Sequence, residues 1–293
     1  MEIAASHEQI HPPRPRPRPP RVTVPAGACD AHAHVFAPAG VYAYAEKRPY
    51  TPAPGTGLAT YRSMLQALGF EHAVLVHSNI YGPDNRATTD ALAEMAGVFR
   101  GIALVRPEID DAALKRLAAL GMRGIRINLE FPGEMGLAEV EVMAPRLADL
   151  GWHLQMLVQA ERLPQIAARL RALPIDVVID HLGLPTPGRG IETEGMNAML
   201  GLLESGRCWV KLSAPYYGDG RPLDFPFAAL VGSRLFAARP DRMLFGTNWP
   251  HPHADPPPDE GDLVDWLAAL TGDGTGLRQV LVDNPARLYG FEP

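Results

Sequence analysis

The fold is decided by a stretch that reads GIALV at residues 101–105, AALKRLAAL at 112–120 and GIRINL at 124–129. In the middle run, apolar residues recur at spacings of three and four, which is typical of a helix that packs one face on a sheet. The two flanking runs are short and apolar, as in parallel strands that are buried on both faces. The stretch therefore predicts a strand–helix–strand unit.

The same unit repeats along most of the chain. The expected strands are Ala28–Phe36, His72–His77, Gly101–Val105, Gly124–Leu129, His153–Val158, Asp176–Asp180, Trp209–Ser213 and Met243–Thr247. The expected helices between them are Leu58–Leu68, Thr88–Gly97, Ala112–Leu120, Ala138–Leu150, Leu163–Leu173, Met196–Glu204, Phe227–Ala238 and Asp262–Leu270. Eight strands and eight helices over about 265 residues predict an α/β fold of the (β/α)8 TIM-barrel type. A doubly wound open sheet is the alternative, but no GxGxxG or GxxxxGK[ST] stands at a strand–helix junction.

Composition narrows the class of protein. The 293 residues are 46% hydrophobic and 20% charged, as in globular proteins, and the net charge of −6 disfavours nucleic acid as a partner. No apolar run approaches the roughly 18 residues that cross a bilayer, and the N-terminus lacks the apolar core of a secretory signal. Only two cysteines occur, Cys29 and Cys208, and they form no CxxC motif. We therefore expect a reduced, cytoplasmic protein with a small-molecule substrate, without a membrane partner and with a homodimer as a general possibility.

Residues 1–24 differ from the rest. Residues 11–21 read HPPRPRPRPPR, in which proline fixes the backbone and the arginines repel one another. This composition predicts a disordered or extended tail, followed by a single barrel domain over residues 25–293. The tail is interpreted either as a solvated terminus or as a docking arm for an acidic partner or a neighbouring subunit.

Polar residues stand where strands 1 and 6 are expected to end, which is the end of a barrel where active sites form. Because side chains alternate along a strand, Asp30, His32 and His34 are expected on one face. Strand 6 ends in Asp180 and His181, so His181 is expected in the site and Asp180 either orients a neighbour or caps a helix. The two histidines of strand 1 predict a site that binds either a metal ion or a single atom of the substrate.

The strand near residue 243 is followed by polar residues as well. Asn248 falls where this strand gives way to its loop, and His251 lies in the loop between two prolines. Asn248 is therefore a candidate for the site, and His251 is a weaker one.

Four ordered motifs resemble the amidohydrolase superfamily. They are D-x-H-x-H-x-F at 30–36, D-H-x-G at 180–183, G-T-[DN]-W-P-H at 246–251 and N-P-x-x-L-Y at 284–289. The branch that the chain resembles contains 2-pyrone-4,6-dicarboxylate lactonase and related lactonases, and the likeness runs from about residue 25 to the end. The resemblance implies a barrel hydrolase that acts on cyclic esters or amides. It also implies that the catalytic residues around the attacking water are His32, His34, His181 and Asn248.

The resemblance also bears on metals. Metal-bearing relatives need a Lys or Glu on strand 4, usually a His on strand 5 and an Asp on strand 8. Here strand 4 offers Arg126 and Asn128, His153 stands at the wrong end of strand 5, and strand 8 offers Asn248. The lactonase branch works without a metal, so we expect no metal and no cofactor. A catalytic Zn2+ held by His32, His34 and His181 is the alternative.

Asn248 stands where the family usually has an aspartate. An amide cannot accept a proton from water and can only orient it. Three readings stay open: a histidine acts as the base, with His34 preferred over His32; the chain is a disabled form that only binds; or the reaction is a lactone isomerisation.

Lactone hydrolysis needs a polarised carbonyl, a positioned water and a stabilised oxyanion. Compared with the dicarboxylate lactonase that the chain resembles, three polar features are missing. Leu157 stands in place of its tyrosine, Leu184 in place of its arginine, and residues 130–132 in place of a basic stretch. We therefore expect a neutral or monoanionic lactone. The expected substrate-binding residues are Tyr50, His77, Ser78, Asn79, Arg126, Asn128, Lys211, Ser213 and His251.

Overall fold

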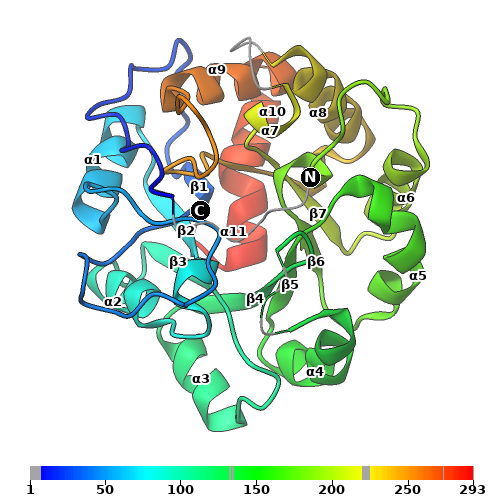
Figure 1. The fold of residues 1–293 in the computed structure, drawn as a ribbon. Helices are drawn as coiled ribbons and strands as arrows, with labels where there is room; N and C mark the ends of the chain where they lie inside the picture. The colour runs from blue at the N-terminus through cyan, green and yellow to red at the C-terminus, as the bar shows by residue number, and fades with distance from the viewer. Residues whose placement is uncertain (1–7, 132, 134, 220–224, 273, 293) are drawn as a thin grey trace.

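The computed structural model describes residues 8–131, 133, 135–219, 225–272 and 274–292 and confirms the predicted barrel (Figure 1). Eight parallel strands follow one another in the sheet in chain order. They are β1 (Cys29–Ala33), β2 (His72–Val76), β3 (Phe99–Ala103), β4 (Met122–Asn128), β5 (His153–Leu157), β6 (Val177–Ile179), β7 (Cys208–Ser213) and β8 (Met243–Gly246). The sequence predicts all eight because most of the strands are short runs rich in apolar residues, which the barrel buries.

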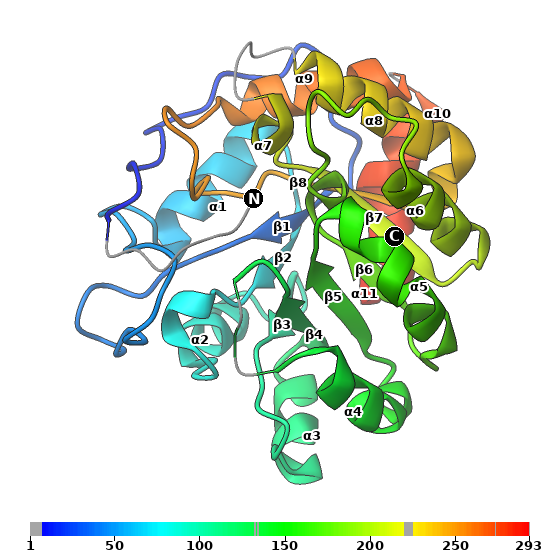
Figure 2. The same ribbon diagram turned by 45° about the vertical axis from the view of Figure 1, so that its right-hand side comes forward.

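Helices surround the strands, as Figure 1 and Figure 2 show. Each of the eight predicted helices begins within two residues of its expected start. None of the described helices is long and apolar enough to cross a membrane. The helices are α1 (Leu58–Leu68), α2 (Arg86–Glu94), α3 (Asp111–Ala119), α4 (Leu137–Asp149), α5 (Leu163–Ala172), α6 (Glu194–Glu204), α7 (Tyr216–Asp219), α8 (Pro226–Ala238), α9 (Glu260–Thr271), α10 (Thr275–Arg278) and α11 (Asn284–Tyr289).

The C-terminal segment fills the end of the barrel at which the strands begin. Tyr289, the last residue of α11, packs with Phe291 against buried residues near the starts of the strands, including Val178 and Trp209. The periodicity of the sequence does not predict α10 and α11, because both are too short to show a helical repeat.

The barrel closes where β8 meets β1. Asn248 N donates to the His32 carbonyl at 2.8 Å, and His34 N donates to the Trp249 carbonyl at 2.8 Å. This approach requires glycine at 246, because a Cβ there would lie 2.4 Å from the Cβ of His32. The closure therefore brings residues 32, 34 and 248 together.

Strand 1 is shorter than predicted and irregular. It ends at Ala33 rather than at residue 36, and its pairing with β2 shifts register between Asp30 and Ala33. The irregularity breaks the expected alternation, and Asp30 hydrogen-bonds Tyr61 of α1 and Thr247 instead of joining the histidines.

The described part of the N-terminal stretch, residues 8–24, forms neither helix nor strand beyond one bridge at Gln9; residues 1–7 of the predicted tail lie outside the described residues. Ile10 N donates to the Thr51 carbonyl at 2.9 Å. Further along, Arg18 pairs with Asp262 and Asp265 of α9, and its backbone N lies 3.1 Å from an Asp259 carboxylate oxygen. The stretch therefore runs in an extended conformation from the β1–α1 loop to the start of α9.

Candidate active site

A pocket of about 390 Å³, including its open mouth, lies at the end of the barrel where the strands finish. Eight of the predicted site residues line it: His34, Tyr50, Ser78, Asn79, Arg126, Asn128, His181 and Asn248. Pro49, Leu157, Tyr217, Pro252 and His253 complete the described lining. The parallel strands carry these residues to one end because all eight run in the same direction.

The three predicted histidines converge. The ring centroid of His32 lies 5.1 Å from that of His34 and 4.5 Å from that of His181. His34 Nδ1 lies 2.8 Å from the Val76 carbonyl, which only accepts, so Nδ1 carries the proton and Nε2 is left as an acceptor. His181 Nδ1 lies 2.8 Å from the Ser213 hydroxyl. Burial lowers the pKa of both His34 and His181 to about 3, so both rings are neutral at pH 7.

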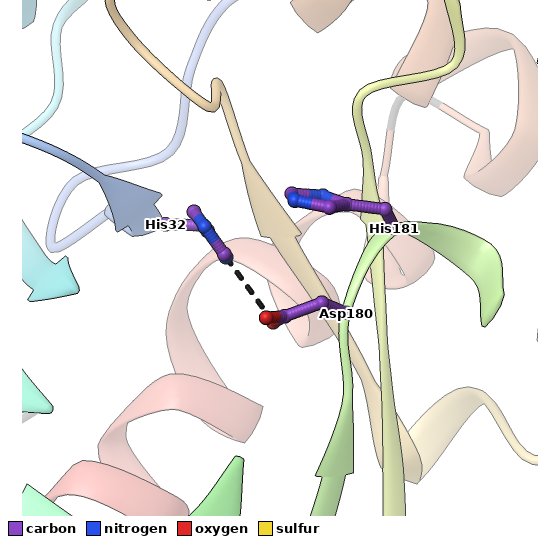
Figure 3. A group of neighbouring side chains, drawn as sticks. All are labelled: His32, Asp180 and His181. Atoms are coloured by element: carbon purple, nitrogen blue, oxygen red, sulfur yellow. Dashed lines mark ion pairs between the residues drawn. The ribbon is translucent and has the colours of Figure 1, made fainter. Parts of the chain in front are cut away.

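Asp180 is the anion beneath the histidines, and the sequence left its role open (Figure 3). Its Oδ1 lies 3.2 Å from His32 Nδ1, while its Oδ2 accepts hydrogen bonds from Arg126 Nε and Gln155 Nε2 at 3.1 Å each. It makes no helix-capping hydrogen bond, so orienting its neighbours is the interpretation that the contacts support. Burial opposes its ionisation, but the surrounding charges, Lys211 and Arg126 among them, hold the pKa of Asp180 well below its usual range.

A metal ion fits this group poorly. Among the described residues, His32, Asp180 and His181 could place ligand atoms within 4.8 Å of one another, so Asp180 takes the place that the sequence assigned to His34. However, the Lys211 ammonium lies 3.3 Å from His32 Nδ1 and 3.7 Å from Asp180 Oδ1. A cation already stands beside two of the three ligands and would repel a divalent ion.

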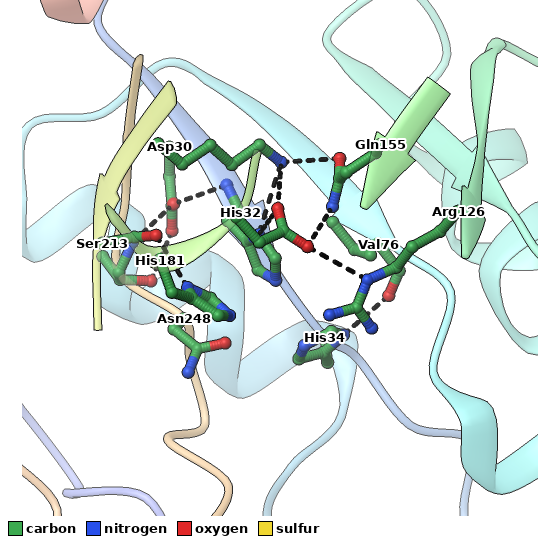
Figure 4. Close-up of polar contacts among 12 residues, drawn as sticks. Asp30, His32, His34, Val76, Arg126, Gln155, His181, Ser213 and Asn248 are labelled. Carbon is green, nitrogen blue, oxygen red and sulfur yellow. Dashed lines mark hydrogen bonds and ion pairs between the residues drawn. The ribbon is translucent and has the colours of Figure 1, made fainter. Parts of the chain in front are cut away.

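Asn248 presents its oxygen to the pocket. Its Nδ2 donates to the hydroxyls of Tyr216 at 2.8 Å and Tyr217 at 3.2 Å. Its Oδ1 is buried and has no hydrogen-bond partner among the described residues. Figure 4 shows this oxygen on the side of His34. The backbone at 248 has a φ of 60°, in the left-handed region that asparagine tolerates better than most residues.

The β4 side of the pocket supplies donors. Asn128 Oδ1 accepts from the backbone N of Glu130 and of Phe131 at 2.9 Å each, which leaves its Nδ2 for the pocket. Arg126 Nε donates to Asp180, and the two terminal nitrogens of Arg126 have no hydrogen-bond partner among the described residues. The pocket therefore has N–H donors on β4, whereas His34 Nε2 and Asn248 Oδ1 offer acceptors near β1 and β8.

Five predicted site residues do not line the pocket. His77 uses Nδ1 on the Thr88 hydroxyl and Nε2 on the Gly82 carbonyl, because the loop after β2 folds back over it. The other four are His32, Lys211, Ser213 and His251. Ser213 contacts His181, and Lys211 contacts His32. His251 contacts the hydroxyl of Tyr216, which itself binds Asn248.

Sequence reasoning missed Tyr216, Tyr217 and His253. The two tyrosines begin the short helix α7 soon after β7 ends at Ser213, so the rule that barrel sites form after strands could have found them. His253 lies in the loop after β8, and its ring centroid lies 5.4 Å from that of Tyr50. No sequence signal separates it from an ordinary loop residue.

Comparisons with known proteins agree with this geometry. The family model described as Amidohydrolase matches residues 29–291. A 2-pyrone-4,6-dicarboxylate hydrolase from Comamonas testosteroni is 36% identical over 89% of both chains. A 4-sulfomuconolactone hydrolase from Hydrogenophaga intermedia is 33% identical over 89% of this chain and 88% of its own.

Two further proteins widen the comparison. A D-galactarolactone isomerase from Agrobacterium fabrum is 28% identical over 90% of this chain and 91% of its own. The crystal structure of a Pseudomonas putida protein, a candidate 2-pyrone-4,6-dicarboxylic acid hydrolase, superposes with a TM-score of 0.81 at 32% identity, covering 92% of this chain and 99% of its own. Motifs, barrel and site geometry agree with these findings, and the chain belongs to the amidohydrolase family.

Proposed function

We propose that this enzyme opens a lactone that is neutral or carries one carboxylate. The observation that carries the proposal is the division of the pocket into donors on β4 and acceptors near β1 and β8. Among the described lining residues, Arg126 is the one lysine or arginine, which suits at most one carboxylate or a developing oxyanion. The relatives that are named as lactone hydrolases support the same class of reaction.

In the proposed reaction, His34 Nε2 and Asn248 Oδ1 hold the attacking water. The water oxygen bonds to the lactone carbonyl carbon while the carbonyl oxygen faces Arg126 and Asn128. As the ring C–O bond breaks, His34 passes the water proton on to the leaving oxygen. The imidazole ring carries that proton only in passing, because burial lowers the pKa of His34 to about 3. The product is a hydroxy acid, which ionises and releases one proton. Asn248 only orients the water, because an amide has no basic site to receive the proton.

Lactone isomerisation is the second candidate. It is favoured by the amide at 248, since a substrate hydroxyl can replace water as the nucleophile. The relative named D-galactarolactone isomerase supports this alternative. In that case the ring C–O bond breaks while another forms, and no acid is released.

A panel of lactones followed with a pH indicator separates these candidates. We expect acid release from a neutral or monoanionic lactone, and weaker turnover of a dicarboxylate because of the single arginine. We expect Asn248→Asp to lower the rate, since its carboxylate cannot donate to Tyr216 and Tyr217. Conversion of a lactone without acid release, seen by NMR, would favour isomerisation. A large gain of activity in Asn248→Asp would show that asparagine disables the site.

We also propose that the reaction needs no metal. Support comes from Lys211 and Arg126, whose charges already balance Asp180. We expect prolonged chelator treatment to change kcat by less than about twofold. A change of about 1.4 kcal/mol in the activation free energy would change kcat about tenfold, so a real metal requirement would be visible. Elemental analysis of the same sample is the check, and about one tightly held zinc per chain with loss of activity on its removal would contradict the proposal.

A cytoplasmic location is part of the proposal. Cys29 and Cys208 are both buried and free. Free cysteines agree with a reducing compartment. The substrate remains the expected small molecule.

A further inference from the structure

Three residues outside the pocket lining connect to Asn248 in series. We propose that Glu260, His251 and Tyr216 form a directed hydrogen-bond chain that fixes the Asn248 amide with its oxygen toward the attacking water. The three are positioning residues. The part of this inference that concerns water rests on the proposed function, whereas the direction of the chain does not.

The contacts run without interruption from α9 to the pocket. His251 Nε2 lies 3.0 Å from Glu260 Oε1, and His251 Nδ1 lies 3.4 Å from the Tyr216 hydroxyl. The same hydroxyl accepts a hydrogen bond from Asn248 Nδ2 at 2.8 Å. All four side chains are buried, so water does not compete for these bonds.

The chemistry of the groups gives the chain a direction. In the proposed direction, Glu260 Oε1 accepts a hydrogen bond from His251 Nε2, which therefore carries a proton. In the neutral imidazole with its proton on Nε2, Nδ1 accepts a hydrogen bond from the Tyr216 hydroxyl. The Tyr216 oxygen in turn accepts from Asn248 Nδ2. Asn248 Oδ1, which has no partner in the described part of the chain, is then left on the His34 side, as Figure 4 shows.

This direction explains why asparagine suits position 248. An aspartate has no N–H for the tyrosine oxygens, so it would compete with His251 for the proton of Tyr216. In this protein the residues behind position 248 are therefore matched to an amide. The backbone supports a built arrangement, because both Asn248 and His251 have positive φ, at 60° and 63°.

The histidine tautomer tests the chain without any substrate. In nitrogen-15 NMR of the histidine-labelled protein, we expect His251, assigned by its loss in His251→Gln, to be protonated on Nε2 only. Glu260→Gln keeps an acceptor oxygen and should preserve that tautomer, whereas Glu260→Leu should release it. A proton on Nδ1 in the wild-type protein would overturn the proposal, because the chain would then run in the opposite direction. If Glu260→Leu does not fold, the wild-type protein and Glu260→Gln still decide.

Kinetics on a lactone found in the panel supply the second test. We expect Tyr216→Phe to lower kcat about tenfold with little change in KM, as for loss of an interaction that acts in the transition state. Glu260→Gln should recover most of the kcat that Glu260→Leu loses. The control is Tyr289→Phe, which removes a buried hydroxyl that has no partner among the described residues, at the other end of the barrel. Equal losses in Tyr216→Phe and Tyr289→Phe would overturn the proposal. A correct tautomer with no lactone turnover would instead count against the proposed function alone.

Discussion

The two ends of the barrel both bury imidazoles, yet they use them differently. At the end where the strands finish, His34 and His181 each bind a partner through Nδ1 and line the pocket. At the opposite end, His153 packs 5.4 Å from the ring of Tyr289, and neither of its nitrogens has a hydrogen-bond partner among the described residues. Burial lowers the pKa of all three to about 3. A shifted pKa therefore marks burial at both ends, and only the hydrogen-bond partners and the pocket mark the site.

The largest expected effect is a loss of activity at the pocket end of the barrel. Because His34 lines the pocket and takes the water proton in the proposed reaction, we expect His34→Gln to lower kcat/KM on the identified lactone by about 10²–10⁴-fold, the range for loss of a positioned acid–base group. The measurement is steady-state kinetics at pH 7.

His153→Leu is the matched variant for this prediction. It removes an imidazole whose pKa is also about 3, but from the other end of the barrel. We therefore expect kcat/KM to stay within about twofold, which is less than the tenfold that a change of about 1.36 kcal/mol in activation free energy would give. A comparable loss of activity in both variants would mean that the two ends are not functionally distinct.

The smaller effect concerns stability in acid. An unfolded histidine takes up a proton near pH 6.5, whereas buried His153 does so only near pH 3. The unfolded state therefore binds more protons as the pH falls, and the free energy of unfolding decreases between about pH 6.5 and pH 3. His153→Leu removes one such contribution, worth up to a few kcal/mol, and should move the midpoint of acid unfolding to lower pH.

Circular dichroism during an acid titration measures this shift. His11→Leu is the control, because its imidazole is half exposed and lies beside Asp255 at the surface, so this variant removes a histidine without removing a buried ring. An unchanged midpoint in His153→Leu would show that burial of this ring does not govern acid unfolding.

Much of the fold was predictable because its signals are local. The helical spacing in Ala112–Leu120 and the apolar runs on either side of it do not depend on distant residues. The same holds for the end of the barrel that carries the site, since His34, His181 and Asn248 all stand just after strands. The early end of β1 was not predictable, because it follows from its pairing with β2 and from the closure against Trp249.

The sequence by itself determined a barrel of eight strands, the end where its chemistry lies and the histidines that meet there. Only the tertiary structure decided that Lys211 and Arg126 balance Asp180, that His77 turns away from the pocket, and how the Asn248 amide is oriented. The physical reason is range. Periodicity and strand ends are set by neighbours in sequence, whereas charge balance and hydrogen-bond direction depend on side chains that come together only when the barrel closes.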